Sequence, residues 1–540
     1  MPKKKRKSAS LPPVFDLGGR DGVPEAGLTG FKAHNLMRMA AMGLSVPQGF
    51  VLATSWCSAV RNNDRVKARL ATALQSGIRD LERTTGLGFG SARRPLLVSV
   101  RSGAAVSMPG MMETVLNVGL NEVSLSGLLR LTGEHRLVWD SYRRLIQAFA
   151  EIVAGAPAAP FEAALDAALR GAGVDTARQL DFRALRELAR TYLTLYSDYT
   201  GHDFPQDPFE QLVAASRAVF ASWGSSKAVA YRRLNGLGDD PGTAVTVQRM
   251  VFGNSGGNSG AGVGFTRDPS SGENRLYLDW LAQAQGEDIV SGRRRVSSDN
   301  EVPGWLVQKL TSVSDSLEKA FQDAQEFEFT VENGELFMLQ TRTAKRTDLA
   351  ALRMAVEMVD SGLVAPEEAL QRLAAIDIDN ITIRRVQSTK PPLGRAIPAG
   401  AGVAQGPAAF SVKAAEAFAR RGTPAVLVRN EVATGDIAGI AVVSGILTAT
   451  GGRTSHAAVV ARQMGKVCLV GCADLVIDEQ ARQARLGETV ILEGDSLCLD
   501  GDAGTVYADA PDIVSERPTA LIRRIGELRA QGEPPVNLSA

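Results

Sequence analysis

The spacing of hydrophobic and polar positions changes several times along this chain, and each change marks a predicted element. Helical spacing fills residues 122–202, so that segment is expected to be a helical insert. Two shorter amphipathic helices are predicted at Asp348–Ser361 and Pro366–Ala375. Residues 393–510 instead alternate short Val, Ile, Leu and Ala strands with glycine-rich turns and helices, a pattern typical of a compact α/β domain.

Two apolar strands precede runs of small residues. Pro95–Arg101 ends in an arginine, and a strand end is where α/β proteins place ligand groups. A guanidinium there suits phosphate through its fork of donors, whereas the plainer reading is a buried, ion-paired arginine. Thr243–Phe252 leads into the glycine-rich residues 253–264, whose N–H groups can wrap a triphosphate. Alone, such a run is as often a flexible turn.

Two alternating strands flank Asn333-Gly334 and predict a hairpin. Alternation puts Glu326 and Glu328 on one face. A two-residue turn at Asn333-Gly334 sends Gln340 to the opposite face. A three-residue loop over Glu332–Gly334, with its glycine left-handed in a bulge, pairs Glu326 with Gln340 instead.

The three-residue loop would gather four polar side chains on one face of the hairpin: Glu326, Glu328, Gln340 and Arg342. Oxygen ligands and an arginine on a common face are what a magnesium–triphosphate requires. We predict the three-residue loop for that reason. The alternative is a hairpin face that is simply solvated.

A glycine-rich turn followed by a short helix is predicted over residues 451–465. Thr454 and Ser455 stand at the N-cap, and the helical spacing predicts one buried face. That face would consist of Ala457, Val460, Ala461 and Met464. His456 lies off it in the first turn, where free backbone N–H groups and the helix dipole would hold a phosphate on its imidazole. An isolated histidine at such a place is more often an ordinary helix-start residue.

Composition narrows the classes of function. A chain of 540 residues is too long for one core and should form about three or four domains. Its 60 basic and 59 acidic residues nearly cancel, so neither nucleic acid nor a membrane is expected as a partner. The basic run at residues 2–7 would pass as a nuclear-localisation signal, but we expect a solvated tail. Four scattered cysteines predict reduced thiols and a cytoplasmic location.

The run GGRTSHAAVVARQMGKVCLVGC, which contains His456, closely resembles the phosphohistidine signature of the phosphoenolpyruvate-utilising enzymes, and specifically of the pyruvate, phosphate dikinases. The stretch from Pro95 to Gly119 also resembles that family, and the likeness extends from about residue 25 to residue 508. The chain departs from the family at Arg453, where a methionine is common, and at residues 278–280.

The resemblance implies a multidomain protein of α/β and α+β class. It would combine an ATP-grasp-like nucleotide-binding domain, interrupted by the helical insert, with a swivelling α/β phosphohistidine domain. The expected segments are a basic tail (1–20), the first part of the nucleotide-binding domain (21–121), the insert (122–202), the second part (203–345), a helical linker (346–390), the swivelling domain (391–510) and a C-terminal helix and tail (511–540).

The resemblance also assigns residues to roles. His456 would receive the phosphoryl group, with Lys32 and Arg101 on the nucleotide phosphates. Gln248, Met250 and Val251 would border the adenine. Glu326 and Arg342 would hold metal-bound phosphates, and Glu328 and Gln340 would bind Mg²⁺. Glu326 stands where the family usually has an aspartate, and Phe31 and Ala33 replace glycines beside Lys32.

The reaction implied is ATP- and phosphate-dependent phosphorylation of His456, with AMP and pyrophosphate as products. Full dikinases continue into a (β/α)₈ barrel of roughly 250 residues that binds pyruvate. Only 32 residues (540 − 508) follow Ala508 here, so transfer to pyruvate is expected to need a separate barrel protein. Two alternatives stay open: another acceptor, as in rifamycin-modifying phosphotransferases, or a non-catalytic nucleotide-sensing partner. Assembly as a homodimer is also left open.

Overall fold

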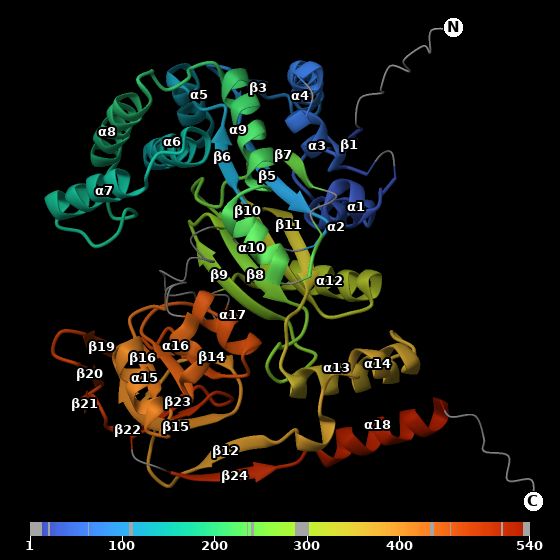
Figure 1. Ribbon diagram of the computed structural model, residues 1–540, viewed down its shortest axis with the longest axis vertical. Coiled ribbons are helices and arrows are strands. Elements are labelled where there is room, and N and C mark those ends of the chain that lie inside the picture. Colours follow the sequence, from blue (N-terminus) through green and yellow to red (C-terminus); the bar gives the residue numbers. More distant parts are fainter. Residues whose placement is uncertain are drawn as a thin grey trace, which may run out of the picture. The chain divides into compact units, whose positions relative to one another are not determined.

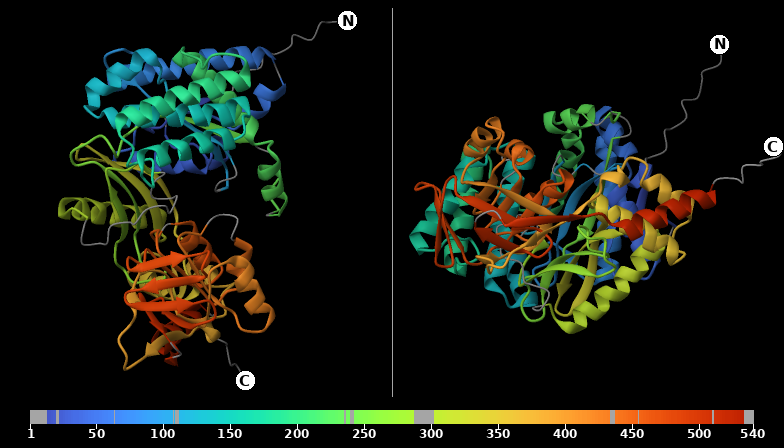
Figure 2. Two further views of the ribbon diagram at one scale, coloured as in Figure 1. Left: turned by 90° about the vertical axis from the view of Figure 1, so that its left-hand side faces the viewer. Right: turned by 90° about the horizontal axis from the view of Figure 1, so that it is seen from below.

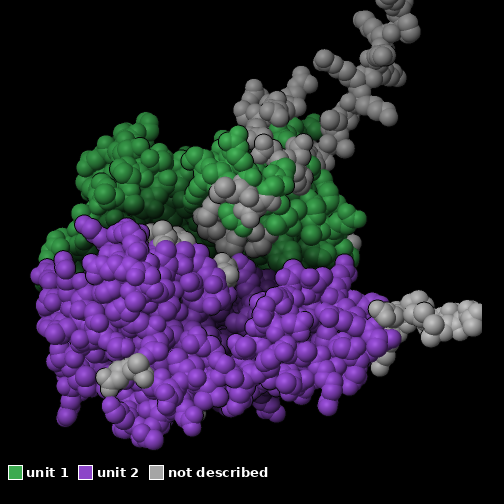
Figure 3. All heavy atoms as spheres, turned by 60° about the horizontal axis from the view of Figure 1, so that its bottom comes forward, with its two compact units in different colours: residues 1–259, 330–341 green, residues 260–329, 342–540 purple. Residues whose placement is uncertain are grey.

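The computed structural model describes most of the chain, and everything below concerns those residues. They are 13–19, 22–62, 64–106, 108, 112–234, 236–238, 242–286, 302–432, 437–453, 455–508 and 511–532. The chain divides into two compact units, each described by itself (Figure 3). Unit 1 contains residues 1–259 and 330–341, and unit 2 contains residues 260–329 and 342–540. No helix in the described ranges combines the length and the hydropathy needed to cross a membrane.

Unit 1 is built on a five-stranded antiparallel sheet (Figure 1). Its order is β1-β2-β7-β5-β6, with bounds Val14–Asp16, Gly49–Leu52, Thr243–Arg249, Val98–Ala104 and Thr114–Val118. Strands β2 and β7 lie inside the sheet, and nearly every residue in them is buried. Short strands β3 (Gly88–Phe89) and β4 (Pro95–Leu96) pair separately. Five helices pack on this sheet: α1 (Ala26–Thr29), α2 (Phe31–Ala41), α3 (Ser55–Asn62), α4 (Asp64–Thr85) and α9 (Pro208–Ser222). Helix α10 (Ser226–Leu234) follows α9.

The segment predicted as a helical insert is helical. It contains α5 (Glu122–Thr132), α6 (His135–Phe149), the π-helix η1 (Ala150–Ala154), α7 (Ala159–Ala172) and α8 (Phe182–Thr200). Helices α6 and α8 lie side by side (Figures 1 and 2). Local chemistry fixes the ends of α5 and α8. Asn121 caps the start of α5 and Asp181 that of α8, and each helix ends at a glycine in the left-handed conformation. Buried aromatic rings on α6 and α8 fill the space between them.

Unit 2 contains most of a second sheet, of order β11-β10-β8-β9. The bounds are β8 Gly260–Phe265, β9 Tyr277–Ala282, β10 Gln325–Glu332 and β11 Glu335–Thr343, and residues 330–341 around the hairpin turn group with unit 1. Helix α12 (Gly304–Phe321) precedes β10. The linker helices α13 (Asp348–Asp360) and α14 (Pro366–Arg372) have nearly the predicted bounds, and α18 (Thr519–Gly532) packs against both (Figure 1).

The rest of unit 2 is an α/β domain around an eight-stranded mixed sheet, reached through a two-stranded ribbon. The ribbon pairs β12 (Ile383–Gln387) with β24 (Asp512–Glu516), and a 3₁₀ turn, η3 (Ile378–Asn380), precedes it. The sheet order is β13-β23-β22-β15-β16-β17-β18-β14. The bounds are β13 Gly394–Arg395, β14 Ile397–Gly400, β15 Val403–Ala409, β16 Val426–Arg429, β17 Gly445–Thr448, β18 Val467–Val470, β22 Ser496–Asp500 and β23 Thr505–Ala508.

Strands β15 to β18 are parallel and carry the crossover helices of this domain. These helices are α15 (Val412–Arg420), α16 (Ile437–Val442) and α17 (His456–Gln463), and a small sheet of β19 (Leu475–Asp478), β20 (Gln483–Leu486) and β21 (Thr489–Leu492) is attached. A mixed α/β multidomain architecture is therefore confirmed. The ATP-grasp-like topology and the predicted segment boundaries stay predictions.

Candidate functional site

Lys32 and Arg101 belong to neighbouring elements of unit 1. Lys32 is the second residue of α2, whose N-cap Gly30 has a φ of 78°. A Cβ on Gly30 would lie 2.2 Å from the carbonyl oxygen of Gly103, so only glycine lets the start of α2 approach β5 this closely. Because Gly103 lies two residues after Arg101, the close approach brings the start of the lysine's helix beside the strand that carries the arginine.

The prediction that the strand ends at Arg101 was wrong. Strand β5 continues through Ser102 to Ala104, and Arg101 pairs with Thr246 in the middle of the sheet. The small residues do not stop the strand, because Ser102 to Ala104 stay paired with β7. The half-buried Arg101 therefore projects from the interior of the strand.

The three residues predicted to border adenine lie at and just beyond the end of β7. Gln248 is buried in the sheet, where its side-chain amide donates to Pro47 O at 3.0 Å and its backbone carbonyl accepts from the Ser99 hydroxyl. Met250 donates its N–H to Leu97 O. In the described part of the chain, no hydrogen bond is made by the backbone of Val251. The backbone groups of Val251 and the carbonyl of Met250 are therefore available to a base.

Glu332, the last residue before the Asn-Gly turn, anchors the segment after β7. One carboxylate oxygen accepts from Phe252 N–H at 2.8 Å, and the other pairs with Arg249 at 3.2 Å. Burial raises the pKa of Glu332, and the N–H of Phe252 and the charge of Arg249 offset this only in part. An acidic residue beside an Asn-Gly turn has many solvated counterparts, so the sequence held no signal for this role.

The glycine-rich run at residues 253–264 was predicted as a phosphate-covering loop, and this was wrong for its last five residues. Residues 260–264 belong to the buried strand β8, where the glycines leave room for aromatic rings. A Cβ on Gly262 would lie 2.1 Å from the Phe329 ring, and one on Gly260 would lie 2.2 Å from the Trp280 ring. Only residues 253–259 form a loop.

That loop is tied to the hairpin turn within unit 1. Asn333 donates its N–H to the Ser259 hydroxyl at 3.0 Å, and Gly334 donates to Asn258 O at 2.9 Å. The Ser259 hydroxyl also bonds that of Ser255. The loop is therefore fixed at its C-terminal end by the hairpin turn.

The three-residue hairpin loop was also a wrong prediction. Strand β10 ends at Glu332 and β11 begins at Glu335, so the loop has two residues. Asn333 has a φ of 52° and Gly334 a φ of 84°, and two positive values in succession define a type I′ turn. A type I′ turn fits the twist of paired strands, and Asn-Gly is its preferred sequence. Local turn chemistry therefore decided the loop.

A β-bulge nevertheless changes the register along the hairpin. The turn places Glu335 opposite Glu332. At the open end, however, Ala344 donates its N–H to Ala324 O at 2.8 Å. Ala344 comes nine residues after Glu335, whereas its partner Ala324 comes only eight residues before Glu332. The second strand of the hairpin, β11, therefore contains one extra residue.

Two further hydrogen bonds locate the bulge. Met338 donates its N–H to Ser45 O, and Thr341 O accepts from the Asn35 amide, so both residues turn their backbone groups away from β10. Such residues are an even number apart in a regular strand, but these two are three apart. The extra residue therefore lies at Leu339–Gln340.

Beyond the bulge, Arg342 is opposite Glu326 and binds it. The guanidinium Nη2 lies 2.5 Å from the Glu326 carboxylate, with side chains 21% and 9% exposed. Burial acts to lower the pKa of Arg342, but the charges of Glu326 and Glu328 outweigh it and raise that pKa. Glu328 thus lies close enough to act on the same guanidinium, which gives two carboxylates and one arginine on this part of the hairpin.

Helix α17 begins at His456, as the sequence predicts. Ser455 is its N-cap, and the Ser455 hydroxyl accepts from Ala458 N–H at 3.4 Å. The predicted buried face was only partly right, because Ala461 is fully buried whereas Met464 is 39% exposed. Ala458, which was not assigned to that face, is fully buried as well. Thr454 and the side chains of His456 and Ala457 lie outside what the structure describes.

The predicted site residues are divided between the two units. Unit 1 holds Lys32, Arg101, Gln248, Met250, Val251 and Gln340, and unit 2 holds Glu326, Glu328, Arg342 and His456. Among the described residues, no group of three or more His, Cys, Asp or Glu side chains is arranged to hold a metal ion. The magnesium ligands assigned to Glu328 and Gln340 therefore stay a prediction.

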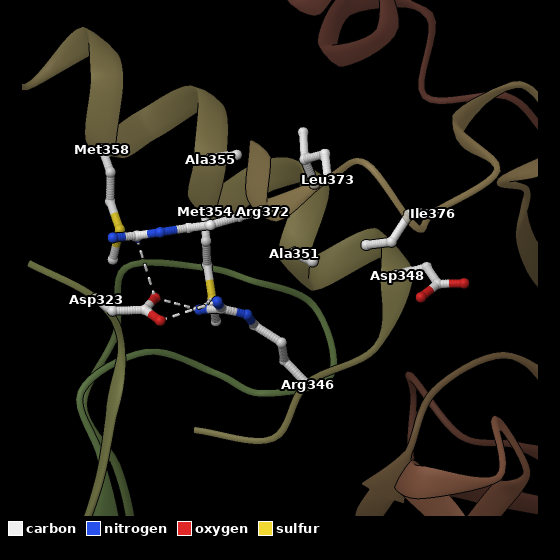
Figure 4. Close-up of a pocket in the computed structure, with 10 residues that line it drawn as sticks. All are labelled: Asp323, Arg346, Asp348, Ala351, Met354, Ala355, Met358, Arg372, Leu373 and Ile376. Atoms are coloured by element: carbon white, nitrogen blue, oxygen red, sulfur yellow. Dashed lines mark hydrogen bonds and ion pairs between the residues drawn. The ribbon is translucent and has the colours of Figure 1, made fainter. Parts of the chain in front are cut away.

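A cavity of about 170 Å³ lies among the linker helices, and none of the residues that line it is a predicted site residue (Figure 4). Asp323 lies at one side of it and pairs with both Arg346 and Arg372. Met354 and Met358 contribute apolar atoms to the lining. The arrangement fastens α13 and α14 to the loop before β10, so we interpret the cavity as part of the linker's packing.

Comparison with known proteins finds a family model for each of two segments of the chain. Residues 65–304 match the family model described as "Pyruvate phosphate dikinase, AMP/ATP-binding domain". Residues 422–504 match the one described as "PEP-utilising enzyme, mobile domain". The resemblance seen in the sequence is confirmed to this extent.

Curated relatives are named pyruvate, phosphate dikinase. The protein of Clostridium symbiosum is 42% identical over 482 residues, which is 87% of this chain and 55% of that protein. That of Giardia intestinalis is 42% identical over 476 residues, covering 86% and 54%. The chloroplastic protein of Flaveria pringlei is 40% identical over 493 residues, covering 90% and 52%. This chain spans about half the length of the curated relatives it matches.

Proposed function

We propose that this chain is a phosphotransferase that carries out the nucleotide half of the pyruvate, phosphate dikinase reaction. In the first step, an imidazole nitrogen of His456 attacks the β-phosphorus of ATP, and AMP leaves. In the second, inorganic phosphate takes the terminal phosphoryl group as pyrophosphate, and one phosphoryl group stays on His456. The observation that carries this proposal is the match of both an AMP/ATP-binding domain and a mobile domain in one chain, with His456 opening α17.

The start of α17 suits a phosphorylated histidine. The backbone N–H groups of a helix's first turn have no partners within the helix, and the dipole is positive there. The Ser455 hydroxyl accepts a hydrogen bond from the N–H of Ala458. The other N–H groups of that turn point toward the N-terminal end of α17. A phosphoryl group next to this end would be stabilised by charge and by hydrogen bonds.

Lys32 and Arg101 would neutralise the nucleotide phosphates. Their elements are held together by the close approach of Gly30 to Gly103, so the two cations belong to one rigid part of unit 1. Val251, and Met250 through its carbonyl, would meet the base beside them. Glu332 supports this assignment, because it anchors the N–H of Phe252 immediately after Val251.

The hairpin would hold the metal-bound phosphates. Magnesium supplies charge neutralisation of the β- and γ-phosphate oxygens when it is bound. Glu328 and Gln340 have the oxygen donors that magnesium prefers. Glu326 would orient Arg342 through their ion pair, leaving the other nitrogens of that guanidinium for a phosphoryl oxygen. Bulges recur beside active sites because they redirect a side chain, and this one falls at Gln340.

In this proposal, onward transfer to pyruvate would use a pyruvate-binding barrel outside the two matched regions. The curated relatives are nearly twice as long as the matched region, so the nucleotide and histidine parts here correspond to about half of each. ATP and inorganic phosphate are the substrates that the matched parts would use themselves. Another phosphoryl acceptor and a purely nucleotide-sensing role are the outcomes against which the proposal is tested.

The test is phosphorylation with ATP labelled at its β-phosphate, in the presence of magnesium. We expect acid-labile label on the wild-type protein and none on His456→Ala. His202→Ala is the matched control, since His202 follows α8 in the helical insert, and it should be labelled normally. Label that survives in His456→Ala would reject the assigned acceptor, and an unlabelled wild-type protein would favour a nucleotide-sensing role.

A further inference from the structure

The β8–β9 hairpin of unit 2 presents a pair of aromatic rings to the domain that carries His456. Phe265 and Tyr277 are directly opposite each other across the two strands, with ring centroids 6.1 Å apart in an edge-on arrangement. They are 1% and 3% exposed. Both belong to a hydrophobic core shared with the linker helices, and the described residues of the phosphohistidine domain contribute nothing to that core.

Two arginines at the ends of helix α17 lie over these rings. The guanidinium carbon of Arg453, just before the helix, is 3.8 Å from the centre of the Tyr277 ring. That of Arg462, near the end of the helix, is 5.5 Å from the centre of the Phe265 ring. Cations at such distances are attracted by the negative face of an aromatic ring.

Strand β14 completes the contact. The Tyr277 hydroxyl donates to Pro398 O at 2.6 Å, and Arg462 donates to Ala399 O at 3.0 Å. Burial raises the pKa of Tyr277, so its hydroxyl keeps its proton and remains a donor. One short strand therefore accepts a hydrogen bond from each side of the contact.

This contact joins parts that have separate cores. The buried residues of the phosphohistidine domain form their own two clusters around its sheet and its helices. The link described here consists of cation–π contacts and hydrogen bonds, which water can replace at little net cost. Such a contact can hold two bodies in one arrangement and still release them.

We propose that Tyr277 and Arg453 are positioning residues that clasp the His456-bearing helix onto the β8–β9 hairpin while the histidine is phosphorylated. This inference rests on the proposed function, because it specifies how that site is assembled. The clasp opens when the phosphorylated domain leaves for its acceptor. Arg453, which stands where dikinases commonly have methionine, gives this chain a charged contact on the tyrosine ring.

Two substitutions test the clasp without disturbing either core. Tyr277→Phe removes only the hydroxyl that reaches Pro398. Arg453→Met removes the cation above the ring and keeps an apolar side chain of similar length. Arg421→Met is the matched control, because it removes a cation–π contact made entirely inside the phosphohistidine domain. The guanidinium carbon of Arg421 lies 6.0 Å from the centre of the Phe418 ring.

The first readout is the single-turnover rate of His456 labelling at saturating ATP, together with the affinity for ATP. We expect the rate to fall about fivefold in Tyr277→Phe and about three- to tenfold in Arg453→Met. ATP affinity should not change, and Arg421→Met should match the wild type. Wild-type labelling rates in both clasp variants would overturn the clasp and leave the proposed function standing.

The second readout is amide hydrogen exchange, which does not depend on catalysis. Opening of the clasp should speed exchange at residues 277–282 and 455–463 in both variants, with protection of β15 to β18 unchanged. Unchanged exchange at the first two segments would overturn the clasp even if the wild-type protein is never labelled. Loss of protection throughout the domain would mean unfolding and would equally reject a specific clasp.

Discussion

A methyl group added at Gly262 tests how the glycine-rich strand β8 works. Its Cβ would lie 2.1 Å from the nearest atom of the Phe329 ring, whereas ordinary contact begins at 3.4 Å. The ring would have to withdraw by 1.3 Å (3.4 − 2.1). Phe329 is 1% exposed and stacks on Trp280 at 5.9 Å with an angle of 6° between the rings, so it has little room to move.

We expect Gly262→Ala to destabilise this sheet by about 2–3 kcal/mol. Overpacking in a filled core costs about 1–3 kcal/mol, and the trapped ring places this site at the upper end. Alanine also lowers the conformational entropy of the unfolded chain, which offsets roughly 0.5–1 kcal/mol of this destabilisation. The midpoint of the thermal transition that includes this sheet should then fall by roughly 5–10 °C.

Differential scanning calorimetry with two companion variants makes the assay specific. Gly526→Ala, on an exposed face of α18 with no atom within 4 Å of the added Cβ, should stabilise its helix by about 1 kcal/mol. Combining Gly262→Ala with Phe329→Leu should recover part of the lost stability. A wild-type melting profile for Gly262→Ala, accompanied by loss of nucleotide binding, would refute the packing explanation and restore the phosphate-covering role.

Two further predictions concern buried carboxylates. Burial acts to raise the pKa of Asp140, but Arg144 and Arg143 outweigh it and lower that pKa, so Asp140→Asn should destabilise the helical insert by about 3 kcal/mol in urea unfolding at pH 7. The folded-state pKa of Asp140 is below its value of 3.8 in the unfolded chain, so its contribution is present above pH 3.8 and should vanish as pH falls further. An equal effect of the substitution at pH 7 and pH 2 would contradict this. The pKa of Glu332 is raised, so its effect on stability runs the other way with pH. Its contribution to the stability of the fold is present below pH 4.5 and is lost as pH rises, so Glu332→Gln should flatten the pH dependence of the melting temperature above that value. Parallel profiles for this variant and the wild type would count against it.

Elements set by local chemistry were predictable from the sequence. The linker helices follow their amphipathic spacing to within a few residues, and α17 begins where a serine cap precedes His456. Capping and helical periodicity act over less than two turns, so they survive almost any tertiary context.

The hairpin shows why the candidate site was only partly predictable. The functional argument required Glu326 and Arg342 on one face, and a three-residue loop was predicted to provide it. The structure obtains the same contact from a type I′ turn and a bulge at Leu339–Gln340. Bulges depend on pairing with a neighbouring strand, so the residues of β11 alone give no sign of one.

Tertiary partners also decided the role of the glycines in β8. A glycine-rich run reads alike whether its N–H groups face a ligand or its bare Cα atoms face aromatic rings. The choice depends on Phe327 and Phe329, more than 60 residues later in the chain and opposite Gly264 and Gly262. Likewise, Arg101 was placed at a strand end because the pairing of Ser102 to Ala104 with β7 is invisible in their composition.

The fate of the γ-phosphate tests the central claim most directly. With ATP labelled at the γ-phosphate, the account predicts labelled pyrophosphate and AMP in equal amounts, formed only when inorganic phosphate, magnesium and an intact His456 are all present. Formation of labelled inorganic phosphate and ADP, or of pyrophosphate without His456, would contradict it.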